Sequence, residues 1–166
     1  GLVENNNVSG PAPAPPTGDN TPVDGIGRVI GMQNTTASFR RKVAEIAGRL
    51  RMNPTHLMAV MSFETGGSFS PSERNRVSGA TGLIHFMPAP ARSLGTSTSE
   101  LARMSPERQL DYVERYLRPY AGRMQTVEDA YMAVLQPIAI GKGANHTLFR
   151  SPRITYRQNR GLDLNR

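Results

Sequence analysis

Glu64 is the residue of this 166-residue chain whose surroundings most suggest chemistry. It is the last position of an apolar stripe formed with Leu57, Val60 and Met61, and the Gly66-Gly67 pair follows almost at once. Burial disfavours the charged form of a carboxyl group, and a carboxylic acid that keeps its proton can protonate a leaving oxygen. Cleavage of a glycosidic bond requires such an acid. Spacing alone leaves a second interpretation open, a half-exposed glutamate paired with one of the many arginines.

A second carboxylate near Glu64 would suggest a hydrolase that activates water. Glu73 is the nearest candidate in the sequence, but its neighbours Arg74 and Arg76 favour a solvated loop acid. Asp129 lies three residues after Thr126, which is the spacing of a helix-capping box. The residues therefore favour a mechanism with a single acid.

Helical periodicity surrounds these residues, and no stretch shows convincing alternation of apolar and polar positions. Helices are predicted to begin after Thr35, at Asn53-Pro54, at Ser105-Pro106 and at Thr126, and a short helix is predicted over 88–94. Their buried faces are predicted at Phe39, Val43, Ile46, Ala47, Leu50, Leu57, Val60, Met61, Leu110, Val113 and Leu117. The fold class is therefore mostly α.

The first 34 residues have a different composition. The segment NNNVSGPAPAPPTGDNTP is rich in Asn, Pro, Ala and Gly and cannot bury enough apolar area to offset its ordering entropy. We therefore predict an extended linker over 1–34 and one folded domain over 35–166. Such a linker could join the domain to other proteins.

Three segments, in order along the chain, resemble the motifs of lytic transglycosylase domains, relatives of goose-type lysozyme that cleave the glycan strands of peptidoglycan. The segments are MSFETGGSFSP, GATGLIHFMP and DAYMAVLQP. The similarity covers roughly 36–160, and the second motif is fairly specific. A fourth segment, LARMSPERQLDYVERYLRPY, most resembles domains of phage virion and phage-derived proteins. The resemblance implies a lysozyme-like helical fold.

The same resemblance implies an activity and a site. Glu64 would protonate the bridging oxygen between MurNAc and GlcNAc and later take a proton from the sugar's own 6-hydroxyl, which leaves 1,6-anhydro-muramic acid ends. The implied substrate-binding residues are Thr65, Gly82, Leu83, Ile84, His85, Phe86 and Tyr131. No cofactor is implied. The expected partner is bacterial peptidoglycan, and the expected location is a phage virion or, after secretion, the periplasm. Other virion or cell-envelope proteins could bind through residues 1–34.

Two positions depart from the family pattern. The family usually has Gln where this chain has His85, and Asn where it has Met132. A histidine can still donate and accept hydrogen bonds, whereas a methionine cannot replace an amide, so we expect Met132 in the core. These departures favour one alternative, a catalytically weak wall-binding or structural module of a virion. A muramidase of the same fold is a separate alternative.

Charge and composition exclude several other classes. The formal net charge is +7, which favours anionic polymers, but the arginines are spread out and lack the interleaved aromatic residues expected for nucleic-acid binding. The chain has no cysteine, so it has neither disulfides nor thiolate metal sites. No apolar run approaches a membrane span. His56, His85 and His146 are too scattered for a zinc site, and the Asp163-Leu164-Asn165 start of a calcium-loop pattern is incomplete.

Overall fold

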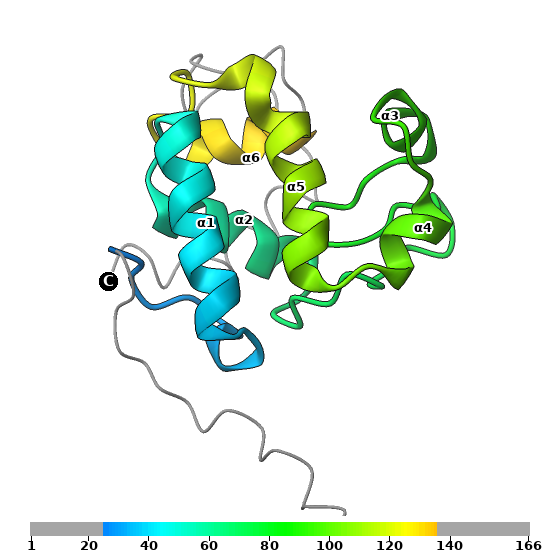
Figure 1. Ribbon diagram of the computed structural model, residues 1–166, viewed down its shortest axis with the longest axis horizontal. Helices are drawn as coiled ribbons and strands as arrows, with labels where there is room; N and C mark the ends of the chain where they lie inside the picture. The colour runs from blue at the N-terminus through cyan, green and yellow to red at the C-terminus, as the bar shows by residue number, and fades with distance from the viewer. Residues whose placement is uncertain (1–24, 136–166) are drawn as a thin grey trace, which may run out of the picture.

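The computed structural model describes residues 25–135, and helices dominate this range (Figure 1). The helical elements are η1 (Met32–Asn34), α1 (Ala37–Leu50), α2 (Pro54–Glu64), α3 (Pro88–Ser93), α4 (Thr98–Arg103), α5 (Pro106–Leu117), η2 (Arg118–Tyr120) and α6 (Val127–Leu135). Between 25 and 135 the only extended pairings are two isolated bridges, Arg74 with Thr81 and Thr81 with Phe86. The predicted all-α class is confirmed. Within the same range no helix is both long and apolar enough to cross a membrane.

The predicted helix starts are confirmed by their caps. The side-chain oxygens of Thr36, Asn53 and Ser105 each accept a hydrogen bond from a backbone N–H in the first turn, at 3.0, 2.9 and 3.1 Å. Thr126 accepts from the backbone N–H of Asp129 at 3.1 Å, as the capping box predicted. Helix α4 was not predicted, although Ser97 caps it in the same way.

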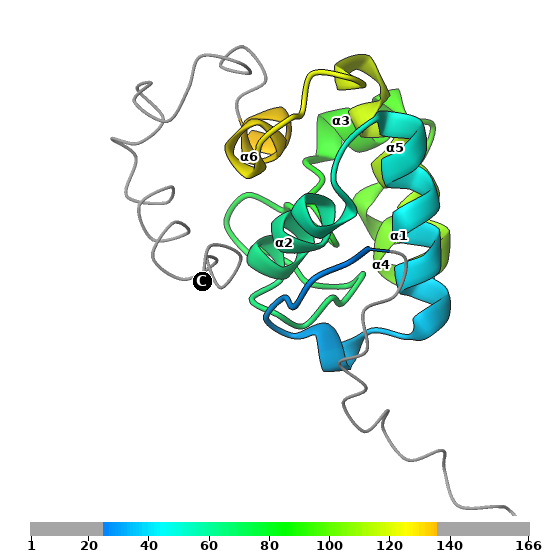
Figure 2. The same cartoon turned by 90° about the vertical axis from the view of Figure 1, so that its left-hand side faces the viewer.

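Helix α2 is the centre of the packing. It contacts α1 on one side and α6 on the other, and α1 also packs along α5 (Figures 1 and 2). All residues of the run 57–62 are buried, so this part of α2 is covered on all faces and not only along the predicted stripe. The buried residues of the helix are Leu57, Met58, Ala59, Val60, Met61, Ser62 and Glu64. Glu64 therefore ends the most enclosed helix of the fold.

Ser62 is the polar member of the buried run 57–62. Its hydroxyl donates to the backbone carbonyl of Ile30 at 2.5 Å, so the segment that precedes α1 satisfies this side chain. Asn34 of the same segment donates from Nδ2 to the carbonyl of Gly67 at 2.8 Å. The segment before α1 thus holds the residues on both sides of Glu64.

This contact corrects the predicted linker at its C-terminal end. Ile26, Val29 and Met32 are buried in the hydrophobic core, so the folded domain begins before residue 35. The sequence interpretation failed because the glycines at 25, 27 and 31 interrupt this short apolar stretch and disfavour a helix. Residues 1–24 and 136–166 lie outside the described range, and with them most of the predicted linker, the end of the predicted domain, His146 and the calcium-loop pattern.

The outer faces of α1 and α5 carry charges that pair across the helix interface. Lys42 Nζ lies 2.9 Å from Asp111 Oδ1, and Arg49 Nε lies 2.6 Å from Glu114 Oε2. The second pair is bidentate, since Arg49 Nη2 also donates to Glu114 Oε1 at 3.0 Å. These pairs align two amphipathic helices whose apolar faces bury the rest of the core.

Candidate active site

The Glu64 carboxyl is enclosed by protein. Its side chain has an exposed fraction of 0%, at the C-terminal end of α2. The chain then turns sharply, because the N–H of Thr65 donates to Met61 O at 3.1 Å and the N–H of Gly67 donates to Ser62 O at 2.7 Å. Gly66 and Gly67 both have positive φ, which glycine adopts without strain. The glycines therefore serve to reverse the chain directly after the carboxyl.

His85 is the residue that the structure brings to Glu64. Its Nδ1 lies 2.9 Å from Glu64 Oε2, and its side chain has an exposed fraction of 17%. Neither ring nitrogen has an aligned hydrogen-bond partner among the described residues, so the contact is close in distance but not linear. The sequence interpretation had placed both residues in one site, and the structure joins them directly.

A tight turn presents His85 to the carboxyl. The backbone N–H of His85 donates to Gly82 O at 3.1 Å, and Thr81 and Phe86 exchange two backbone hydrogen bonds at 2.9 and 3.0 Å. His85 has φ +52°, in the left-handed region that side chains rarely adopt. Such a conformation persists only where the surroundings enforce it. The orientation of the imidazole is therefore built into the turn.

Gln109 on α5 holds this turn in place, and the sequence interpretation missed it. Its side chain is fully buried, its Oε1 accepts from Leu83 N at 2.7 Å, and its Nε2 donates to Pro71 O and Leu101 O at 3.0 and 2.8 Å. A Cβ on Gly82 would lie 2.3 Å from Gln109 Oε1, so only glycine fits there. The available signal was a glutamine beside Leu110 on the apolar face of a helix.

Tyr116 is a second residue that the sequence interpretation did not single out. Burial raises the pKa of its phenol, and the nearby Tyr120 and the Glu64 carboxylate raise it further. Its ring packs edge-to-face on Phe86, with centroids 5.9 Å apart, and its hydroxyl donates to Val134 O at 3.4 Å. Tyr116 falls seven residues after Gln109, on the same face of α5.

Tyr131 lies on α6, next to the end of α2. Its ring meets Phe63 edge-to-face, with centroids 5.3 Å apart, and its hydroxyl donates to Ala59 O at 3.4 Å. Both rings are half-buried. The pair therefore provides partly exposed aromatic surface beside Glu64, of the kind on which a sugar ring can pack.

Most of the expected substrate-binding side chains are enclosed. Thr65 uses its hydroxyl within the fold, donating to Met61 O at 2.8 Å and accepting from Phe69 N at 2.9 Å. Leu83, Ile84 and Phe86 belong to the core. Of the expected set, His85 and Tyr131 keep partly exposed side chains. The others shape the loop that carries His85.

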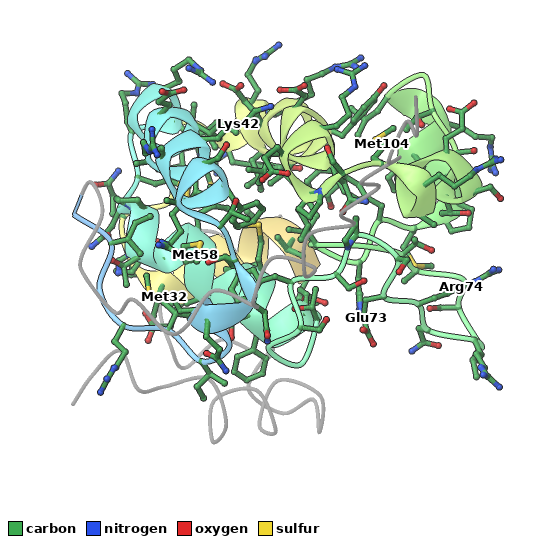
Figure 3. The ribbon with its side chains drawn as sticks, turned by 60° about the horizontal axis from the view of Figure 1, so that its bottom comes forward. Met32, Lys42, Met58, Glu73, Arg74 and Met104 are labelled. Atoms are coloured by element: carbon green, nitrogen blue, oxygen red, sulfur yellow. The ribbon has the colours of Figure 1, made fainter. Side chains whose placement is uncertain are left out.

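The remaining sequence candidates are Met132 and Glu73. Met132 is a buried core residue of α6. Glu73 accepts a hydrogen bond from the Ser68 hydroxyl at 3.3 Å, and Figure 3 shows its side chain and that of Arg74 leaving the loop in different directions. Within residues 25–135, no group of three or more His, Asp or Glu residues could hold a metal ion.

The chain matches no protein-family model, no curated protein and no solved structure at a significant level.

Proposed function

We propose that this chain is a peptidoglycan lytic transglycosylase in which Glu64 is the general acid and base. The observation that carries the proposal is an enclosed carboxyl at the end of the central helix α2, 2.9 Å from the His85 imidazole. The motifs around both residues resemble those of lytic transglycosylase domains. The resemblance to phage proteins supports a virion or secreted, periplasmic location, with the bacterial cell wall as partner.

The proposed reaction needs one acid. Glu64 donates its proton to the bridging oxygen as the bond from C1 of the muramic acid residue to that oxygen breaks. The 6-hydroxyl of the same sugar then bonds to C1, and the Glu64 carboxylate takes the hydroxyl proton. Atoms balance without water, and the nucleophile is held close by the ring to which it belongs. Glu73 has a different position, on a loop and bonded to Ser68.

Access of substrate to Glu64 requires a rearrangement of the site. A side chain with no exposure cannot touch a sugar oxygen, so substrate binding has to displace a covering group. This enclosure favours a second candidate function, a wall-binding or structural module that keeps the fold without turnover. Measurement of activity separates the two.

The decisive variant is Glu64→Gln, which keeps the shape of the side chain and removes the transferable proton. We expect the release of soluble fragments from purified cell walls to fall at least about a hundredfold, as expected when a general acid is lost. The matched control is Glu73→Gln, which should keep most of the rate. Equal rates for the parent and the Glu64 variant would contradict the assignment, and no cutting by the parent would favour the wall-binding module.

The product separates a transglycosylase from a muramidase. Walls digested in heavy-oxygen water should release fragments with 1,6-anhydro ends, with no label and no new reducing group. Label at each cut, with a reducing end, would identify water as the nucleophile and the protein as a muramidase.

A further inference from the structure

The contact between His85 and Glu64 supports a step beyond the proposed function, on which it rests. We propose that His85 is a positioning residue that keeps its own proton on Nδ1 and donates it in a hydrogen bond to Glu64 whenever that group is a carboxylate. The acid–base unit is then a carboxyl–imidazole pair and not a lone glutamate.

Distance and burial bring the two groups together. Nδ1 and Oε2 are 2.9 Å apart, which is within hydrogen-bond distance. Catalytic hydrogen bonds are often poorly aligned before substrate binds. Because the carboxyl is enclosed, an interaction with it is little weakened by solvent.

The second ring nitrogen decides which tautomer fits. Nε2 is buried and has no hydrogen-bond partner among the described residues. A proton there would be a buried N–H without an acceptor, which costs free energy, whereas a proton on Nδ1 faces the Glu64 oxygen. The surroundings therefore favour the tautomer with its proton on Nδ1.

The backbone around His85 holds the imidazole next to the Glu64 carboxyl. His85 is held in the left-handed region by the turn from Thr81 to Phe86, and Gln109 anchors that turn through Leu83. Among residues 25–135, the Tyr116 phenol on α5 is a further titratable group near the pair, since its pKa is raised by burial and also by the Glu64 carboxylate.

The role in the reaction follows from this geometry. When Glu64 has given its proton to the bridging oxygen, it becomes an enclosed carboxylate, and the Nδ1–H stabilises that charge. The imidazole transfers no proton. Glu64 regains its proton from the 6-hydroxyl as the new bond to C1 forms.

The test compares three variants in wall digestion. His85→Gln keeps an N–H donor and should stay within about fivefold of the parent, whereas His85→Leu should lower kcat at least about tenfold with a smaller change in KM. His56→Gln is the matched control, because His56 is a half-buried histidine eight residues before Glu64 on α2, roughly 12 Å along the helix. An equally large loss of kcat in His85→Gln and His85→Leu, or no loss in either, would overturn the inference.

A second readout does not depend on activity. Ring-nitrogen chemical shifts of labelled histidine should show His85 with its proton on Nδ1 in the parent and a changed tautomer ratio in Glu64→Leu. A proton on Nε2 in the parent would overturn the inference even if walls are cut. If the parent cuts no wall, the proposed function fails together with the catalytic role, while the nitrogen shifts still decide whether the pair exists.

Discussion

The helical frame and the loop over 65–87 are stabilised in different ways. The frame, formed by α1, α2, α5 and α6, buries contiguous apolar faces, and its helices begin at side-chain caps. The loop has no helix or strand. It depends on glycines with positive φ, on the turn that carries His85, and on one buried side chain from the frame, Gln109. The site joins the two regions, because Glu64 ends a frame helix and His85 belongs to the loop.

The difference suggests how a rigid acid can become accessible. Apolar packing in the frame responds to small changes in volume and keeps Glu64 fixed. The loop contributes Leu83, Ile84 and Phe86 to the core, but its remaining residues rest on a few directed hydrogen bonds and can move at a smaller cost. We therefore expect substrate to displace the loop side of the site. Variants of the frame and of the loop should differ in how much stability they lose and in how much of the domain the change affects.

The largest effect should come from the segment before α1. Deletion of residues 1–34 removes Ile26, Val29 and Met32 from the core, and burial of three such side chains contributes on the order of 5 kcal/mol. Deletion of 1–24 alone removes a stretch that is poor in apolar residues. Thermal melts should show a large loss of Tm for the longer deletion and little change for the shorter one. Equal Tm values for the two deletions would show that residues 25–34 do not stabilise the domain and behave as a linker.

Gln109→Leu should have an intermediate and local effect. The substitution keeps a similar volume but leaves Leu83 N–H and the carbonyls of Pro71 and Leu101 without their partner, a loss of about 3 kcal/mol. Hydrogen exchange should rise most in 65–87.

Leu110→Ala is the matched control for that prediction. It creates a cavity in the frame one residue further along α5 and should cost about 2–5 kcal/mol. Exchange should then rise throughout the helices. If both variants speed exchange in the same amides, the loop and the frame unfold as one unit and the comparison fails.

The smallest effect should come from the Arg49–Glu114 pair on the outer face of the frame. The hydrogen bonds from Arg49 lower the pKa of Glu114, so the pair stabilises the fold above the usual range for glutamate and stops doing so as the pH falls through the lowered value. Because Arg49 is mostly exposed, Glu114→Gln should cost only about 0.5 kcal/mol at neutral pH. Urea unfolding at neutral pH and near pH 2 should show that the stability difference between the parent and Glu114→Gln shrinks in acid. A difference that stays constant would show that the charge of Glu114 does not contribute to it.

The frame could be predicted from the sequence to a much greater extent than the loop. Caps at Asn53 and Ser105 and apolar residues at helical spacing are local signals, and they predicted these helices correctly. The environment of Glu64 was predicted as one buried stripe, whereas α2 is enclosed on all faces over 57–62.

The missing parts depend on contacts between distant residues. Gln109 bonds to Leu83 across 26 positions, and Asn34 bonds to Gly67 across 33. The local sequence pattern around each residue does not predict a partner so far along the chain. The sequence indicated that Glu64 and His85 belong to one site, but the 2.9 Å contact arises from a turn in which a histidine, as well as Gly82, is left-handed.

The close backbone contact between Gly31 and Gly67 limits which substitutions this sequence can accept. A Cβ on Gly31 would lie 1.9 Å from the carbonyl oxygen of Gly67, so the two backbones touch where any side chain would separate them. Gly67 is three residues after Glu64, so a substitution at Gly31 would displace the backbone close to the Glu64 carboxyl. The glycine that looks most dispensable, in the segment that looks least structured, is thus among the positions least free to change.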